Sequence, residues 1–108
     1  MTIVRKINSR DLDVKIREKR EKALVLFYGN WCQDCREFKP LWEDWTKGKT
    51  GPIFAVEIVR GGPEWEEWSI EEIPTVAAYS KGFEMGRADG VISEKDLDSL
   101  WKDKLSLK

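Results

Sequence analysis

The sequence predicts an α/β fold in which a mixed central sheet is flanked by helices on both faces. Residues 23–28 form a continuous apolar run, which is typical of a central strand buried on both faces. Strand-like and helix-like segments alternate in the first half, which favours parallel strands joined by right-handed crossovers. Two strand-like segments around Lys81-Gly82 predict a final antiparallel hairpin. A length of 108 residues suits a single domain over residues 1–108 that buries about two-thirds of its unfolded surface.

The first predicted elements are a short strand and a charged helix. Residues 3–7 alternate in polarity, as a half-buried strand does. Ser9 is predicted to be the N-cap of a helix over residues 10–21. Leu12 and Ile16 are spaced one helical turn apart and mark the apolar face of this helix.

The apolar run at residues 23–28 is followed by a second helix. Gly29-Asn30 ends the strand, and the helix is predicted to begin near Cys32. Its apolar side chains fall on one face at helical spacing, and they are Phe38, Leu41, Trp42 and Trp45. Pro40 lies inside this helix, where it removes a backbone hydrogen bond and is expected to impose a kink.

A further strand and a short helix follow. Residues 47–52 have the composition of a loop, and residues 53–59 predict a strand that ends at Gly61-Gly62-Pro63. Residues 64–72 predict a short helix whose inward side chains are Trp65, Trp68 and Ile70.

The chain is predicted to end with a hairpin and a helix. Residues 75–79 and 83–88 are expected to pair across the turn at Lys81-Gly82. Ser93 is expected to cap the last helix, whose core side chains are Leu97, Leu100, Trp101 and Leu105. The predicted order is therefore strand, helix, strand, helix, strand, helix, strand, strand, helix.

The composition excludes several classes of function. Nineteen basic and twenty acidic residues give a net charge of −1 without a basic stripe, so we expect no nucleic-acid binding. No apolar stretch approaches the ~20 residues of a membrane span. Arg5 and Lys6 interrupt the apolar residues near the N-terminus, so we expect no signal peptide and a cytoplasmic protein. The chain has no His, which removes Cys–His nucleophile pairs and Cys/His zinc sites, so we expect no metal.

The chemistry of the chain is concentrated in Trp31-Cys32-Gln33-Asp34-Cys35, which holds both of its cysteines. Two residues between the thiols let one helical turn bring the sulfurs together for disulfide exchange. Cys32 is predicted at a helix start, where free N–H groups and the helix dipole stabilise a thiolate. A bridge this short closes almost no loop and adds little stability. The motif therefore indicates a reversible Cys32–Cys35 redox disulfide, with no bound cofactor.

Five features along the chain resemble the thioredoxin family. They are Trp31-Cys32-x-x-Cys35, Pro40 within the following helix, Ile73-Pro74-Thr75, Gly82 in the hairpin and Gly90 before the last helix. Their order and spacing match the family over nearly the whole chain, so the resemblance implies the thioredoxin fold.

The resemblance implies a disulfide reductase with defined residue roles. Cys32 would be the exposed attacking thiol and Cys35 the buried resolving thiol. Pro74 would follow a cis peptide that faces the site, and Trp31 would shape the docking surface beside Cys32. The implied partners are disulfide-containing proteins and a thioredoxin-reductase-like flavoprotein, which would hold the flavin. We expect a monomer.

One departure from the family lies between the cysteines, where Gln33-Asp34 stands in place of the usual Gly-Pro. The Asp34 carboxylate should disfavour the Cys32 thiolate and so make the site a stronger reductant. Alternatively, Asp34 only complements the positive end of the helix. Both interpretations are compatible.

A second departure removes a proton acceptor. Thioredoxins carry a buried Asp six residues before the first cysteine, and here that position is Leu26. Glu57 is an acid within the next strand and could take over the proton role. Alternatively, Glu57 lies at the strand end facing solvent or pairs with a Lys or Arg.

Three functions remain open at this point. The first is an active thiol–disulfide oxidoreductase. The second is an adaptor that binds partners through the Pro74 face and turns over little, an alternative that Leu26 supports. The third is a metal or cluster module shared by two chains, which the two thiols favour least. Trp65 and Trp68 are expected to fill the core, with substrate contact as the alternative.

Overall fold

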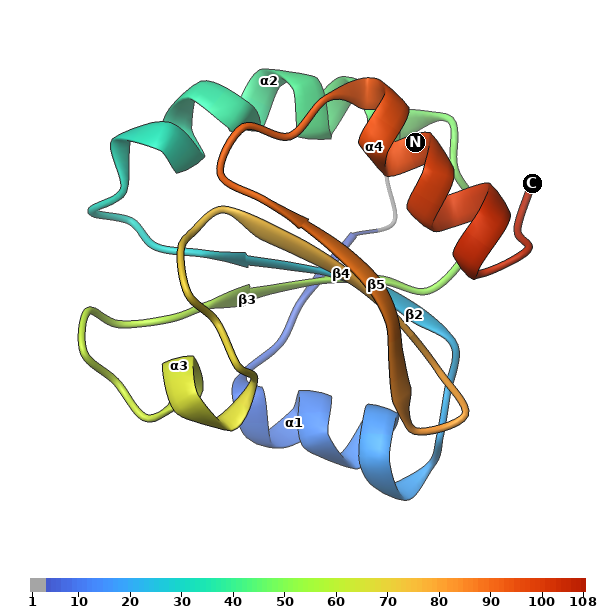
Figure 1. Ribbon diagram of the computed structural model, residues 1–108, viewed down its shortest axis with the longest axis horizontal. Helices are drawn as coiled ribbons and strands as arrows, with labels where there is room; N and C mark the ends of the chain where they lie inside the picture. Colours follow the sequence, from blue (N-terminus) through green and yellow to red (C-terminus); the bar gives the residue numbers. More distant parts are fainter. Residues whose placement is uncertain (1–3) are drawn as a thin grey trace.

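The computed structural model describes residues 4–108, and it has a five-stranded mixed sheet at its centre (Figure 1). The strand order is β1-β3-β2-β4-β5. β2 pairs in parallel with β3 and antiparallel with β4, so the apolar run predicted as a central strand lies in the middle of the sheet. The strands are β1 (Arg5–Lys6), β2 (Ala23–Tyr28), β3 (Ile53–Glu57), β4 (Thr75–Ser80) and β5 (Phe83–Asp89).

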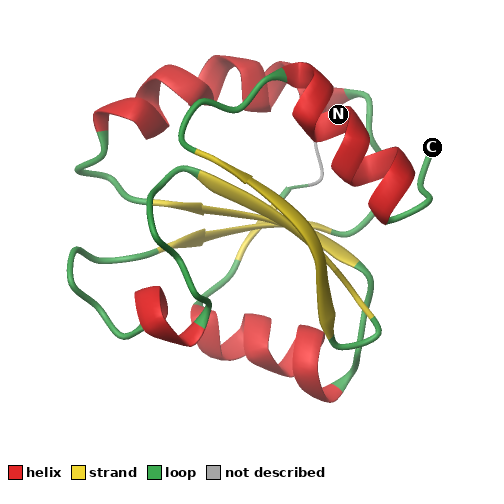
Figure 2. Ribbon diagram, in the orientation of Figure 1, coloured by secondary structure: helices red, strands yellow, loops and turns green. Residues whose placement is uncertain are grey.

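Helices cover both faces of the sheet, as predicted. α2 and α4 lie over one face, while α1 and α3 lie over the other (Figures 1 and 2). α1 and α4 each run directly into a π-helical segment, named η1 and η2. The helical segments are α1 (Ser9–Asp13), η1 (Val14–Glu18), α2 (Gln33–Lys47), α3 (Glu64–Glu67), α4 (Glu94–Asp98) and η2 (Ser99–Lys104).

The hydrophobic core is divided by the sheet into two clusters. Successive residues of β2 alternate between them: Val25 and Phe27 belong to one cluster, and Leu24 and Leu26 to the other. This alternation follows from the two-residue repeat of a strand. Because both faces of β2 are buried, its C-terminal end is held rigidly, and the site begins at that end.

The first predicted strand and the cap of the first helix differ from expectation. β1 comprises only Arg5–Lys6, and part of the predicted strand lies outside the described residues. The N-cap is Asn8 rather than Ser9, because the Asn8 side-chain oxygen accepts a hydrogen bond of 2.8 Å from the Asp11 N–H. Ser9 is the first helical residue. The helical segment ends at Glu18, and Arg20 adopts a left-handed conformation (φ 56°).

The strand predicted over residues 53–59 and the helix predicted over residues 64–72 are both shorter in the structure. β3 ends at Glu57, and α3 ends at Glu67. Ser69 adopts a left-handed conformation (φ 54°), which stops the helix. Trp68 and Ile70 are buried as expected, whereas Trp65 is only half-buried.

Two predictions about helix signals are confirmed. Pro40 lies inside α2. Ser93 caps α4 through a capping box: its Oγ accepts a hydrogen bond of 3.1 Å from the Asp96 N–H, and the Asp96 Oδ2 accepts one of 2.9 Å from the Ser93 N–H. Within residues 4–108, none of the helices combines the length and apolar character that crossing a bilayer requires.

Tyr79 of β4 places a hydroxyl in the core. It is 4% exposed and packs edge-to-face on Trp68, with ring centroids 5.7 Å apart. Within residues 4–108, its hydroxyl has no hydrogen-bond partner. Burial, and secondarily the charge of Glu84, raise the pKa of Tyr79 far above its ordinary value. The folded protein therefore keeps Tyr79 protonated at pH values where the unfolded chain releases the proton.

We expect Tyr79→Phe to flatten the alkaline loss of stability. Above about pH 10 the unfolded chain loses the phenol proton and the folded protein does not, so stability falls by up to about 1.4 kcal/mol per pH unit for this group. The variant lacks this contribution and also lacks an unpaired hydroxyl, so its stability at pH 7 should be equal or higher. Denaturant unfolding at several pH values from neutral to 11 measures both effects. Identical slopes above pH 10 for the two proteins would contradict the assignment.

Candidate active site

The turn between β2 and α2 brings the two cysteines together. Cys32 is the N-cap of α2, with an extended backbone (φ −93°, ψ 114°). Its Sγ accepts a hydrogen bond of 3.0 Å from the Cys35 N–H. The two residues form a disulfide, and their Cα atoms are 5.2 Å apart, within the usual range for such a bond. The predicted reversible disulfide and its place at a helix start are therefore found together.

The two cysteines do not differ in exposure in this oxidised state. Cys32 is 7% exposed and Cys35 is 8% exposed. The expected contrast between an exposed and a buried thiol is thus absent in the disulfide-bonded form. What distinguishes Cys32 is its environment: its Sγ accepts the helix N–H and lies 3.7 Å from the carbonyl oxygen of Ile73.

The Ile73–Pro74 peptide is cis, as the resemblance implied. The Ile73 carbonyl oxygen faces Cys32, so the reduced thiol can donate a hydrogen bond to it. Gly90 lies alongside, because its N–H donates a hydrogen bond of 3.0 Å to the Pro74 carbonyl oxygen. Gly90 has a left-handed backbone (φ 71°), and a Cβ there would come within 3.0 Å of the Glu72 carboxylate. The glycine is therefore required by both its conformation and its surroundings.

Trp31 lies beside Cys32 and is held by stacking. Its ring stacks on Trp65, with centroids 6.2 Å apart and planes at 24°, and the Arg60 guanidinium carbon lies 4.5 Å from its centroid. Within residues 4–108, the buried indole N–H of Trp31 has no hydrogen-bond partner. A Cβ on Gly29 would approach the indole to 2.9 Å, so only glycine fits beneath the ring.

The sequence pattern predicts no role for Arg60, and it predicts that Trp65 fills the core, with substrate contact as the alternative. Trp65 is half-buried, and its Nε1 donates a hydrogen bond of 2.8 Å to the Val59 carbonyl oxygen. The signal available in the sequence is Gly61-Gly62-Pro63, which ends the predicted strand just after Arg60. The Gly62 N–H donates to the Val59 carbonyl oxygen (3.0 Å) in this turn.

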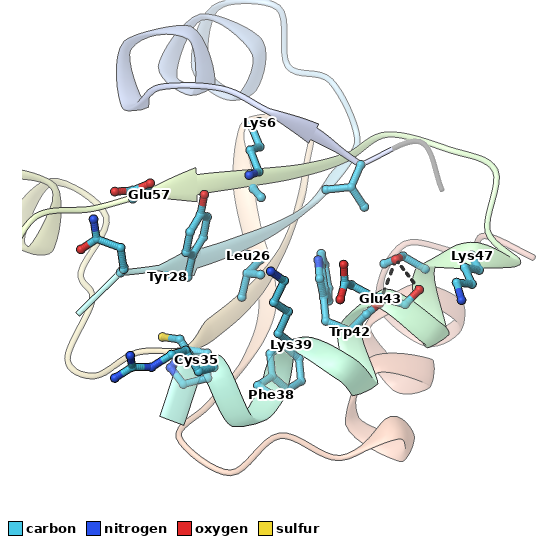
Figure 3. A pocket seen from close by; sticks show the side chains of 17 residues that line it. Lys6, Leu26, Tyr28, Cys35, Phe38, Lys39, Trp42, Glu43, Lys47 and Glu57 are labelled. Carbon is cyan, nitrogen blue, oxygen red and sulfur yellow. Dashed lines mark hydrogen bonds between the residues drawn. The ribbon is translucent and has the colours of Figure 1, made fainter. Parts of the chain in front are cut away.

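An open groove of about 610 Å³ reaches Cys35 between α2 and the strands β1, β2 and β3 (Figure 3). Its floor is apolar, and Leu26 contributes to it. Leu26 is 7% exposed, so the position where the family has a buried Asp is an apolar core position here. Charged side chains surround this floor: Lys6, Arg36, Lys39, Glu43, Lys47 and Glu57.

Glu57 lies at the rim of the same groove. It is the last residue of β3 and its side chain is exposed. Within residues 4–108, no ion pair or hydrogen bond engages its side chain, so the solvent-facing alternative describes its position. Tyr28 and Cys35 lie at the same end of the groove as Glu57 (Figure 3). Burial, and secondarily the negative charge of Glu57, raise the pKa of Tyr28 above its ordinary value.

Gln33 and Asp34 lie in the first turn of α2, and both side chains are exposed. The Gln33 Nε2 donates a long hydrogen bond of 3.5 Å to the Glu37 Oε1. Asp34 places its carboxylate at the N-terminus of α2, where the helix dipole stabilises a negative charge. In the described part of the chain, no group of three or more His, Cys, Asp or Glu side chains could hold a metal ion.

Comparisons with known proteins agree with this geometry. The family model described as Thioredoxin matches residues 3–103. A protein named Thioredoxin from Mycoplasmoides gallisepticum is 29% identical over 96 residues, which cover 88% of this chain and 95% of the relative. Probable thioredoxin-2 from Caenorhabditis elegans is 24% identical over 98 residues, covering 89% of this chain and 68% of the relative.

A solved structure of similar shape is the thioredoxin of Schistosoma mansoni. The TM-score is 0.77 at 20% identity, with 93% of this chain and 94% of that chain covered, so this likeness shows the thioredoxin fold. The family match extends over nearly the whole chain and includes the cysteine pair. The chain therefore belongs to the thioredoxin family, and it is a thiol–disulfide oxidoreductase whose Cys32 and Cys35 form a disulfide at the start of α2.

Proposed function

We propose that this protein reduces protein disulfides with Cys32 as the attacking thiol and Cys35 as the resolving thiol. The observation that carries this assignment is the hydrogen bond of 3.0 Å from the Cys35 N–H to the Cys32 Sγ at the start of α2. A donor at this position stabilises negative charge on Cys32, together with the dipole of a 15-residue helix. Cys32 is thus the sulfur that is favoured as a thiolate.

The reaction proceeds by two exchanges. The Cys32 thiolate attacks one sulfur of the substrate disulfide, forms a mixed disulfide and releases the first substrate thiolate, which takes up a proton. Cys35 then loses its proton and attacks the Cys32 sulfur. The second substrate sulfur leaves as a thiolate and takes up a proton. The substrate disulfide has then gained two electrons, and Cys32 and Cys35 have lost two electrons in forming their own disulfide.

Substrate docking is proposed around Trp31 and the Ile73–Pro74 peptide. Pro74 has no backbone N–H, so it cannot donate a hydrogen bond to a neighbouring strand. The backbone carbonyls beside it can accept hydrogen bonds from an extended substrate segment. Trp31 offers a rigid aromatic surface next to Cys32. The substrates are disulfide-containing proteins, and these contacts suit an extended segment beside the attacked disulfide.

The proposed redox cycle is completed by a thioredoxin-reductase-like flavoprotein, which returns two electrons to the Cys32–Cys35 disulfide. The flavin belongs to that partner, because this chain carries no nucleotide-binding fingerprint. We place this electron transport and redox homeostasis in the cytoplasm, with the protein acting as a monomer and without metal, nucleic acid or membrane.

We propose that Glu57 accepts the Cys35 proton through water in the groove. Cys35 and Glu57 line the same open groove, and Leu26 removes the buried carboxylate that the family places nearer to the thiol. An exposed carboxylate at the rim can exchange protons with groove water during the second step. Between the cysteines, the negative charge of Asp34 disfavours the Cys32 thiolate and so influences the rate of its attack on the substrate disulfide.

Replacing each cysteine separates the two proposed roles. Cys32→Ser should abolish the reduction of insulin by catalytic protein with dithiothreitol, because no attacking thiolate remains. Cys35→Ser should lose turnover but accumulate a mixed disulfide with the substrate, since attack still occurs and resolution does not. Non-reducing electrophoresis detects that adduct. Turnover by Cys32→Ser at the wild-type rate would refute the role of Cys32 as the attacking thiol. If the protein were instead an adaptor, the wild type would show no turnover, and both variants would bind partners as the wild type does.

Glu57→Gln tests the proton role. We expect the rate of disulfide reduction to fall about tenfold, less than for a general base in direct contact because water intervenes, and its pH profile to shift. Glu43→Gln is the matched control, since Glu43 is an exposed carboxylate on the same groove and should leave the profile unchanged. In the Glu57→Gln background, Leu26→Asp should restore rate by placing an acid at the family's position. An unaltered pH profile in Glu57→Gln would rule out this role.

Asp34→Asn should make the reduction potential less negative by at least about 10 mV. Removing the carboxylate favours the Cys32 thiolate, which stabilises the reduced form, so alkylation at pH 7 should also be faster. Redox titration against glutathione and the rate of alkylation by iodoacetamide measure these effects. Glu37→Gln removes an exposed charge from the next turn of α2 and serves as the control. Equal potentials for wild type and Asp34→Asn would leave only the helix-dipole interpretation.

A further inference from the structure

The guanidinium of Arg60 lies over the ring of Trp31, the residue that directly precedes the proposed nucleophile. Arg60 lies in the loop between β3 and α3, and its side chain is exposed. Its Cζ is 4.5 Å from the centroid of the Trp31 ring, and Trp31 directly precedes Cys32. A positive charge therefore borders the surface on which a substrate must dock to reach Cys32.

Stacking leaves the hydrogen-bond donors of Arg60 unused. A cation–π contact uses the positive charge of the guanidinium and takes up none of its five N–H donors in a hydrogen bond, so these donors stay available. Within residues 4–108, no hydrogen bond or ion pair engages the Arg60 side chain. The unused donors form a planar fork that matches a carboxylate.

A second stacked arginine shows the contrast. Arg17 lies over Trp68, with its Cζ 4.1 Å from the ring centroid. Its N–H groups donate to the Asp13 carboxylate, to the Glu67 carboxylate and, at 3.0 Å, to the Glu67 carbonyl oxygen. The N–H donors of Arg17 thus join α1 and η1 to α3. Arg60 also lies over a tryptophan ring, but its N–H donors make no hydrogen bond within residues 4–108.

The support beneath Arg60 is itself rigid. Trp31 stacks on Trp65, which is anchored by its hydrogen bond of 2.8 Å to the Val59 carbonyl oxygen, and Gly29 allows the indole to lie close to the backbone. Since the Trp31 N–H has no partner in the described chain, packing alone holds the ring. The contact with this ring restricts the Arg60 side chain, so ordering it on a ligand costs less entropy than ordering an arginine without such a contact.

We propose that Arg60 is a specificity-determining residue that binds a carboxylate of the substrate, so that the protein prefers disulfides flanked by Asp or Glu. This inference rests on the proposed function and adds the class of substrate. Glu72 lies instead beside Gly90, on the Pro74 side of the site, where its charge repels acidic groups. A substrate carboxylate is therefore directed toward the Trp31 side, where Arg60 lies.

Two peptide disulfides of equal length test the proposal, one with Glu and one with Lys next to each cysteine. At low salt, wild type should reduce the Glu peptide with a kcat/KM about two- to fivefold higher, the range expected of an exposed ion pair. Arg60→Glu should reverse this preference. Arg60→Lys should weaken it, because the charge remains and the planar fork is lost. In about 1 M salt, where the screening length is about 3 Å, the preference should largely disappear.

The control variant is Arg10→Glu, which makes the same change of charge on the exposed surface of α1. It should keep the wild-type ratio. Equal ratios for wild type and Arg60→Glu, or an equal change in Arg10→Glu, would overturn the role of Arg60. Rapid reduction of both peptides at equal rates overturns this inference alone, whereas a wild-type protein that reduces neither peptide overturns the proposed function and this inference with it.

Discussion

The chemistry of this protein depends on one local arrangement, in which a sulfur takes the place of a side-chain oxygen at a helix N-cap. The Cys32 Sγ accepts a hydrogen bond of 3.0 Å from the Cys35 N–H, so the geometry that ends the turn also stabilises negative charge on the sulfur proposed to attack. The arrangement is rigid because β2 precedes it and is buried on both faces of the sheet. The carbonyl oxygen of the cis Ile73–Pro74 peptide, just before β4, faces Cys32. Gly90, just after β5, donates a hydrogen bond to Pro74, and Trp31 directly precedes Cys32.

Leu26 changes how the proton of Cys35 must travel. A buried carboxylate would carry a large desolvation cost unless it were paired, and an apolar residue at this position removes that cost. The consequence is a groove with an apolar floor and charges only around it. On the route proposed above, proton exchange with Cys35 passes through water in this groove. On that route, the pH dependence of reduction follows Glu57 at the rim of the groove rather than an interior acid.

Local signals account for what could be predicted from the sequence. The apolar run of β2, the cysteine spacing and the capping box at Ser93 each act within a few residues, and the structure contains all three. Asn8 and Ser9 are adjacent residues that both make good N-caps, so sequence cannot choose between them. The exposure of Glu57 depends on where β3 ends against its neighbours. The contacts of Trp31 with Arg60 and Trp65 join distant segments, so no local periodicity reveals them.

The way in which Trp31 is held links stability to recognition at the site. Here Arg60 and Trp65 fix the ring by stacking, and the unpaired N–H is offset by dispersion and cation–π attraction. Because the net charge of the chain is only −1, local charges rather than a global field must orient a substrate. The substrate preference proposed for Arg60 would therefore be set by a local contact, that of its guanidinium with the Trp31 ring beside Cys32.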